Sequence, residues 1–115
     1  MHRVLLTAFG PYDDWSENAS WLVLQDLLRD TPQQIDLVTR LYPVDFAKVG
    51  SRLAEDLKLG FDTVLSLGQA PGNARVAIEG VGLNIARERG MRPEDAVPLD
   101  PAGPPAYFSE LPLKA

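Results

Sequence analysis

The chain has 115 residues, of which 45% are hydrophobic, with a formal net charge of −5 and no cysteine. This length allows one domain, and the hydrophobic fraction is ordinary for a globular protein. The acidic balance, without any stripe of basic residues, argues against nucleic-acid binding. The lack of cysteine excludes disulfides and thiolate metal sites. No apolar run approaches the roughly 20 residues that span a bilayer, and no signal-peptide pattern follows Met1, so we expect a cytoplasmic protein with no membrane partner.

The first element that the sequence predicts is a buried strand over residues 3–8, because a short apolar run there ends at Gly10-Pro11. A helix should follow, capped by Asn18 or Ser20. Its apolar side chains recur at helical spacing and share one face: Trp21, Leu24, Leu27 and Leu28.

A second strand and a second helix come next. Residues 35–42 alternate as a strand does, and Pro43 ends the pattern. Asp45 is a good N-cap for an amphipathic helix that should end before Gly60. The apolar stripe of this helix is Phe46, Val49, Leu53 and Leu57. Residues 63–67 then form a third short strand.

This order of strands and helices is typical of a layered α/β fold with an at least partly parallel sheet. In such sheets the loops after the carboxyl ends of the strands converge on one ligand crevice, which here points to residues 9–17 and 68–74. We expect a single α/β domain over residues 1–115. Within it, residues 75–84 should add a further strand or extended segment, and residues 86–115 should form an irregular, proline-rich segment.

Five side chains in these regions are candidates for chemistry. Phe9 and Tyr12 are either local packing residues or a pair of aromatics that could hold a flat ligand ring. Glu79 has apolar neighbours in the sequence, so it is either an exposed residue of an edge strand or an acid that orients an imidazole. Arg87 and Arg89 are of a type that is usually solvated, although one of them could donate to an anion.

Other chemistries find little support. Residues 68–72 (GQAPG) match neither the dinucleotide-binding fingerprint nor the P-loop, so a tight turn is favoured over a phosphate site. Ser66 does not lie in a G-x-S-x-G elbow, and no internal histidine could activate it, because the only histidine is His2. The acidic residues have no metal-ligand spacing, so we expect no metal and no cofactor.

Several short blocks follow one another in a recognisable order. They are residues 5–12 (LLTAFGPY), 18–21 (NASW), 65–70 (LSLGQA) and 103–114 (GPPAYFSELPLK), together with Glu79 and Asn84. In this order they resemble the pyroglutamyl-peptidase I (pyrrolidone-carboxylate peptidase) family. Each block alone is weak, but together they extend over nearly the whole chain and a little over half of a typical member.

The resemblance implies a three-layer α/β/α fold around a mixed, mostly parallel sheet, incomplete in this chain, and often a homo-oligomer. It implies a thiol protease without a cofactor that hydrolyses peptide substrates with an N-terminal pyroglutamate. Glu79 matches the family's acid that orients the histidine base. Phe9 and Tyr12 match two aromatics that hold the pyroglutamyl ring, and Gln69 lies on the loop lining the pocket. Arg89 matches an arginine near the oxyanion.

The same resemblance implies that the nucleophilic Cys and the His base lie in a half that this chain does not contain. We therefore expect the chain to supply the orienting acid and the lactam pocket, and to be inactive as a peptidase by itself. The alternative is a short non-catalytic homologue that binds a small lactam or a protein partner. A nucleotide-binding module is the least favoured hypothesis.

The chain also departs from the family pattern. Tyr12 stands where the family usually has Phe, and Ala19 stands in place of a usual Pro. Residues 71–73 replace a Gly-Gly-Arg-like stretch. Residues 90–103 form a shorter, rewritten segment, which weakens the match of Arg89.

Overall fold

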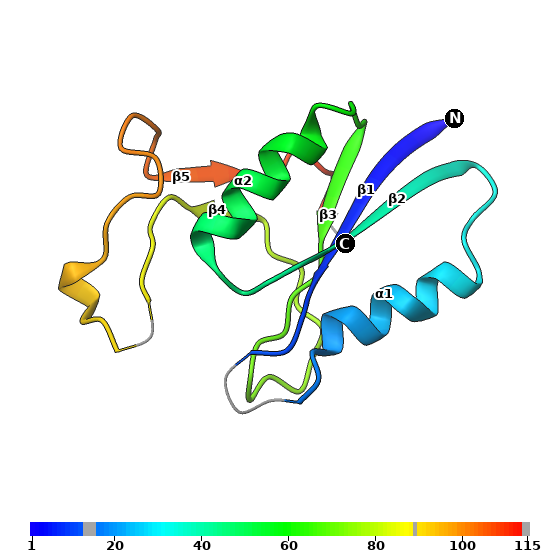
Figure 1. The fold of residues 1–115 in the computed structure, drawn as a ribbon. Helices are drawn as coiled ribbons and strands as arrows, with labels where there is room; N and C mark the ends of the chain where they lie inside the picture. The colour runs from blue at the N-terminus through cyan, green and yellow to red at the C-terminus, as the bar shows by residue number, and fades with distance from the viewer. Residues whose placement is uncertain (13–15, 89, 114–115) are drawn as a thin grey trace. The chain divides into compact units, whose positions relative to one another are not determined.

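The computed structural model describes residues 1–12, 16–88 and 90–113, and it divides into two compact units (Figure 1). Unit 1 comprises Met1–Pro71 and unit 2 comprises Gly72–Ala115. The elements of unit 1 are β1 (His2–Phe9), α1 (Ala19–Arg29), β2 (Ile35–Tyr42), α2 (Phe46–Leu57) and β3 (Thr63–Ser66). Those of unit 2 are β4 (Val81–Leu83), the short 3-10 helix η1 (Pro93–Asp95) and β5 (Ala106–Phe108).

Unit 1 is built on a parallel sheet with the strand order β2-β1-β3. Helix α1 connects β1 to β2, and α2 connects β2 back past β1 to β3. Crossovers between parallel strands are right-handed, so two crossovers that run in opposite directions place their helices on opposite faces of the sheet. The register determines which side chains share a face, because Leu6 lies opposite both Thr39 and Leu65.

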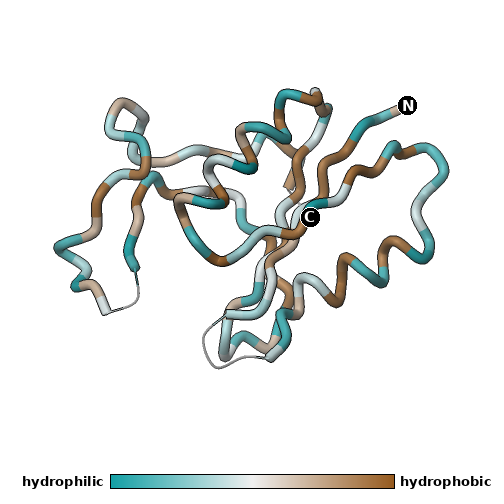
Figure 2. The backbone as a smooth tube through the Cα atoms, in the orientation of Figure 1, coloured by the Kyte–Doolittle hydropathy of each residue, from teal (hydrophilic) through white to brown (hydrophobic). Residues whose placement is uncertain are grey.

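The hydrophobic core of unit 1 lies between this sheet and α1. Leu6 and Ala8 of β1 pack with Leu24 of α1, and all three are almost fully buried. Figure 2 shows the corresponding pattern, with hydrophobic and hydrophilic residues alternating along α1. The partly buried residues around this cluster are Trp21, Leu37 and Leu67. Leu27 and Leu28, which the helical spacing placed on the same face, are more than 40% exposed.

Helix α2 covers the other face. Arg40 and Tyr42 alternate with the core-facing residues of β2, and both contact Asp56 of α2. Unit 1 therefore has the helix–sheet–helix layering of a three-layer α/β/α fold, which confirms the predicted fold class.

The predicted helix boundaries are also confirmed. Asn18 rather than Ser20 is the N-cap of α1, and its Oδ1 accepts the backbone N–H of Ser20. Asp45 caps α2 by accepting the N–H of Lys48. Gly60 has a φ of +80°, a left-handed conformation that favours glycine after a helix.

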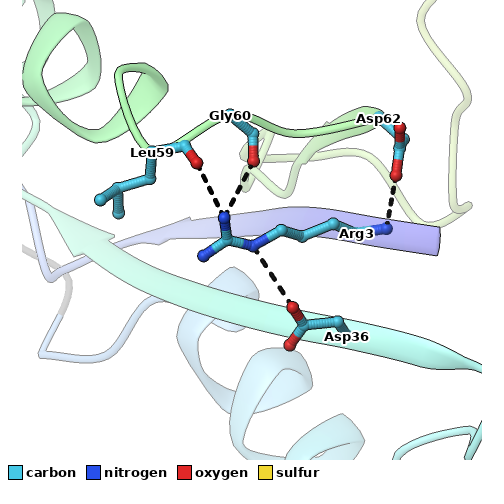
Figure 3. Close-up of polar contacts among 5 residues, drawn as sticks. All are labelled: Arg3, Asp36, Leu59, Gly60 and Asp62. Atoms are coloured by element: carbon cyan, nitrogen blue, oxygen red, sulfur yellow. Dashed lines mark hydrogen bonds and ion pairs between the residues drawn. The ribbon is translucent and has the colours of Figure 1, made fainter. Parts of the chain in front are cut away.

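At the amino ends of the strands, Arg3 connects all three of them (Figure 3). Its backbone N–H donates to Asp62 Oδ2 at 2.8 Å, and its carbonyl accepts the N–H of Asp62 at 2.9 Å. Its Nη1 donates to the carbonyls of Leu59 at 2.7 Å and Gly60 at 3.2 Å, in the turn after α2. Its Nε lies 3.3 Å from Asp36 Oδ2 on β2, an ion-pair distance without hydrogen-bond alignment.

Unit 2 contains one antiparallel pair, β4 with β5. The strand or extended segment predicted for residues 75–84 is a strand only at Val81–Leu83. Asn84 is the buried polar residue that organises this unit. Its Nδ2 donates to the carbonyls of Asp100 and Pro104, and its Oδ1 accepts the N–H of Asp100. These three side-chain bonds tie Asp100 and Pro104 of the proline-rich segment to the residue after β4.

Among the residues described, no helix combines the length and the apolar composition required to cross a membrane.

Candidate functional site

The loops that follow β1 and β3 meet at the carboxyl edge of the sheet, as the parallel order of the strands predicts. Phe9 ends β1, and Tyr12 follows it after Gly10-Pro11. Gln69 follows β3. The hydroxyl of Tyr12 donates to the backbone carbonyl of Gln69 at 3.1 Å, so two of the predicted site residues are in direct contact.

Asn18 and Ser20 fix the loop after β1 to the start of α1. The Ser20 hydroxyl accepts the N–H of Phe9 at 2.9 Å and donates to Asn18 Oδ1 at 2.6 Å. Asn18 Nδ2 donates to the carbonyl of Gly10 at 3.1 Å. Both polar side chains are at most 3% exposed, and burial in the absence of water strengthens such a satisfied network.

Gln69 is held at two of its atoms. Besides the bond from Tyr12 to its carbonyl, its side-chain Oε1 accepts the N–H of Ala19 at 2.7 Å. That N–H belongs to the first residue of α1 and has no acceptor within the helix. The bond therefore satisfies a helix end and orients the amide of Gln69, so that Nε2, a donor, is the end of the amide that this bond leaves available.

The base of the loop is supported by β2. Gly10 N–H donates to the carbonyl of Tyr42 at 3.0 Å. The Tyr42 hydroxyl donates to Asp56 Oδ2 at 2.6 Å, and Arg40 Nε donates to Asp56 Oδ1 at 3.0 Å. Burial and the hydrogen bond to Asp56 raise the pKa of Tyr42 to about 12. The hydrogen bond from Tyr42, with a further one from Arg40, holds the pKa of Asp56 below its ordinary value, although burial opposes this effect.

Two shallow cavities of unit 1 lie elsewhere. One of about 390 Å³ is on the α2 side, lined by Arg40, Leu41, Tyr42, Ser51, Arg52, Glu55 and Asp56. The other, of about 370 Å³, is formed by residues of α1. Neither is lined by Phe9, Tyr12 or Gln69, and the candidate site is defined by the contact between Tyr12 and Gln69.

The remaining predicted residues belong to unit 2. Glu79 is exposed and lies in the irregular stretch before β4. Arg89 lies outside the described residues. Within the described parts of the chain, no group of three or more His, Asp or Glu side chains could hold a metal ion.

Comparison with known proteins identifies the family. The model of the pyroglutamyl peptidase family matches residues 2–115. The chain belongs to the pyroglutamyl peptidase family. It is 38% identical over 121 residues to a pyrrolidone-carboxylate peptidase of Clavibacter michiganensis, in a match that covers 100% of this chain and 56% of the relative. It is 36% identical over 118 residues to pyrrolidone-carboxylate peptidase 1 of Caldanaerobacter subterraneus, with 97% and 57% covered.

Solved structures agree with this family. The crystal structure of the pyrrolidone carboxyl peptidase from Fervidobacterium islandicum AW-1 superposes with a TM-score of 0.85 and 30% sequence identity. That match covers 94% of this chain and 54% of the solved chain. The chain thus spans a little over half the length of the pyroglutamyl peptidases that it matches.

The sequence makes Phe9 and Tyr12 candidates as aromatic residues of a crevice loop, and the family resemblance adds Gln69, but none of these signals predicts the hydrogen bonds that hold the two loops. The sequence predicts Asn18 as a helix cap, but it does not predict the hydrogen bond from Asn18 to Gly10. No sequence pattern indicates a role for Tyr42, because its carbonyl and its hydroxyl bind residues that are distant in the chain, Gly10 and Asp56.

Proposed function

We propose that this chain forms part of an enzyme that removes N-terminal pyroglutamate from peptides. The proposal rests on the family match over residues 2–115, since the relatives are peptidases of that name. It is supported by the contact of Tyr12 with Gln69, which places two of the predicted pocket residues on adjoining loops.

In this proposal the chain provides the pocket for the lactam ring. The pyroglutamyl ring is flat and uncharged, so aromatic faces and a few hydrogen bonds can select it without a charged partner. Phe9 and Tyr12 would supply the aromatic faces. Gln69, with an amide donor left available by its bond to Ala19, would supply polar contacts.

The covalent chemistry requires groups that the sequence does not hold. Acyl transfer of this type needs a thiolate activated by an adjacent imidazole. The 115 residues include no cysteine, and their one histidine, His2, hydrogen-bonds Thr63 at the amino end of the sheet, opposite the candidate site. Glu79 would orient the imidazole and Arg89 would lie near the oxyanion. We propose that thiol and imidazole come from sequence corresponding to the unmatched part of the relatives, and that the chain alone does not turn over substrate.

A direct test uses the chain itself. Binding of L-pyroglutamyl amide and of L-prolyl amide is measured by NMR titration, because the two rings have the same size but only the first is an uncharged lactam. We expect binding of the pyroglutamyl compound, with shifts at Tyr12 and Gln69, and no release of dye from a fluorogenic pyroglutamyl amide. Equal binding of both amides would contradict the lactam pocket, and turnover above the blank would contradict the need for further residues.

The role of Glu79 is tested in a chimera that joins this chain to the unmatched part of the Clavibacter relative. Glu79→Gln should lower kcat by at least about 100-fold, as expected when an imidazole loses its orienting acid. Glu88→Gln, a nearby exposed carboxylate, is the matched control. Equal activity of the two variants would remove Glu79 from the mechanism.

A second candidate function is binding without hydrolysis, which the lack of cysteine favours. It predicts a lactam-binding protein whose intact mass in its source is 12.6 kDa. A larger mass would favour the peptidase. The cytoplasmic location and the homo-oligomer stay predictions.

A further inference from the structure

We propose that the hydroxyl of Tyr12 is a latch that positions Gln69. This hydroxyl joins the loop after β1 to the loop after β3, 57 residues further along the chain.

The latch acts on a residue that already has a second attachment. The Gln69 carbonyl accepts the Tyr12 hydroxyl at 3.1 Å, and Oε1 of the same residue accepts the Ala19 N–H at 2.7 Å. One bond fixes the backbone of Gln69 and the other fixes its side chain. Because Tyr12 lies in the loop after β1 and Ala19 begins the helix that follows this loop, the two bonds restrain Gln69 against the same part of the molecule.

The partners of Gln69 are themselves rigidly held. Asn18 and Ser20 tie the start of α1 to the carbonyl of Gly10 and to the N–H of Phe9. Tyr12 is half-buried, which limits competition from water for its hydroxyl. The Tyr12 hydroxyl thus joins the backbone carbonyl of Gln69, in the loop after β3, to this scaffold.

The consequence for ligand binding rests on the proposed function. A loop that is ordered before the ligand arrives pays less conformational entropy on binding. Without the latch, the Gln69 backbone would be restrained by its neighbours in the chain and by the one side-chain bond. Tyr12→Phe keeps the aromatic ring and removes the latch alone, so it should weaken lactam binding roughly fivefold, the factor expected from one neutral hydrogen bond.

The test first measures the latch without ligand. Exchange of the Ala19 N–H with water is followed by NMR, with the Lys48 N–H as internal control, because that N–H is likewise exposed and bonded to a side-chain oxygen, Asp45 Oδ1. Tyr12→Phe should accelerate exchange at Ala19 roughly threefold or more and leave Lys48 unchanged. Tyr107→Phe, which removes a hydroxyl in unit 2, should change neither amide.

Two further variants complete the design. Gln69→Ala removes Oε1, the acceptor of the Ala19 N–H, and should accelerate exchange at Ala19 at least as much as Tyr12→Phe does. Adding Tyr12→Phe to Gln69→Ala should have no further effect. If Tyr12→Phe leaves Ala19 exchange unchanged, or if its effect persists in the Gln69→Ala background, the latch is overturned.

The titration with L-pyroglutamyl amide then separates the two proposals. If the native chain binds the amide and Tyr12→Phe binds it as tightly, the positioning role is overturned while the lactam pocket stands. If the native chain does not bind the amide, the proposed pocket fails, and the exchange data still decide whether the Tyr12 hydroxyl positions Gln69.

Discussion

Replacing Arg3 should destabilise unit 1 more than replacing an exposed arginine does. In Arg3→Met the aliphatic part of the side chain is kept, while the guanidinium and its bonds to the carbonyls of Leu59 and Gly60 are lost. The two hydrogen bonds that the backbone of residue 3 makes to the N–H and the carboxylate of Asp62 do not involve the side chain of residue 3 and should persist. The variant therefore isolates the guanidinium.

The magnitude follows from three contributions. A hydrogen bond from a charged donor contributes about 1.5–3 kcal/mol, and the Nη1 group of Arg3 donates to two carbonyls. The ion pair to Asp36 adds little, because surface pairs contribute about 0–1 kcal/mol and the two side chains are 37% and 53% exposed. The guanidinium also lies 5.0 Å from the centre of the Phe61 ring, a cation–π contact of about 0.5–1 kcal/mol at exposed sites. Because the Arg3 side chain is partly exposed, these contributions are reduced, and we expect a loss of about 2 kcal/mol in the free energy of unfolding.

Urea unfolding followed by tryptophan fluorescence and circular dichroism measures this loss. Asp36→Asn removes only the ion pair and should lower the free energy of unfolding by less than about 0.5 kcal/mol. High salt should abolish most of this difference. Arg52→Met, at an exposed residue of α2, is the matched control. If Arg3→Met and Arg52→Met unfold at the same urea concentration, or if high salt removes the whole effect of Arg3→Met, the carbonyl bonds contribute nothing and the reasoning is refuted.

Three further predictions concern single contacts of unit 1. Asn18→Ala should lower the free energy of unfolding by about 1–2 kcal/mol in urea titration, because it removes both a helix cap and the bond to Gly10. Gly60→Ala should cost about 1 kcal/mol by the same measurement; nothing lies within 4 Å of the added Cβ, so the loss is backbone strain at a φ of +80°. The pKa of Tyr42 is raised from 10 to about 12, so folding favours the protonated phenol. Its contribution is fully present below pH 10 and is lost as the pH rises to 12, by about 1–2 kcal/mol, a loss that Tyr42→Phe should abolish.

Local signals predicted most of unit 1. In ending or capping a helix, Asn18, Asp45 and Gly60 act within three residues of their own positions, so a single segment contains the information for these helix ends. The parallel order then determined which loops meet, and the Tyr12–Gln69 contact lies where those loops were expected.

Distant pairing was harder to predict. The segment around Glu79 is apolar in sequence, but Val76 and Ile78 are 98% and 76% exposed in the structure. An apolar run forms a strand only where a neighbouring strand supplies hydrogen bonds, and here the partner of β4 is β5, more than 20 residues further on. The Tyr42–Asp56 bond was missed for a similar reason, because it joins a strand to the far end of the following helix.

The strand register connects the stability of unit 1 to its candidate site. Shifting β3 by one residue along β1 would move its end by about 3.3 Å and turn its side chains to the other face. That displacement exceeds the 3.1 Å length of the Tyr12–Gln69 bond, so a slipped strand would break the contact. The register is fixed at the amino end by two hydrogen bonds between Arg3 and Asp62: the Asp62 N–H donates to the Arg3 carbonyl, and the Arg3 N–H donates to the Asp62 carboxylate.

At the carboxyl end, the same register is fixed by β1 and the residue after β3. The backbone carbonyl of Thr7 accepts the N–H of Leu67 at 2.8 Å, and the Thr7 hydroxyl donates to the Ser66 hydroxyl at 3.1 Å. Thr7→Val would keep the first bond and the shape of the side chain while it removes the second. Because the backbone ladder stays intact, this variant should lower the free energy of unfolding by about 1 kcal/mol and leave the exchange of the Ala19 N–H unchanged. Faster exchange at Ala19 would show that the position of Gln69 depends on the Thr7 hydroxyl as well as on Tyr12.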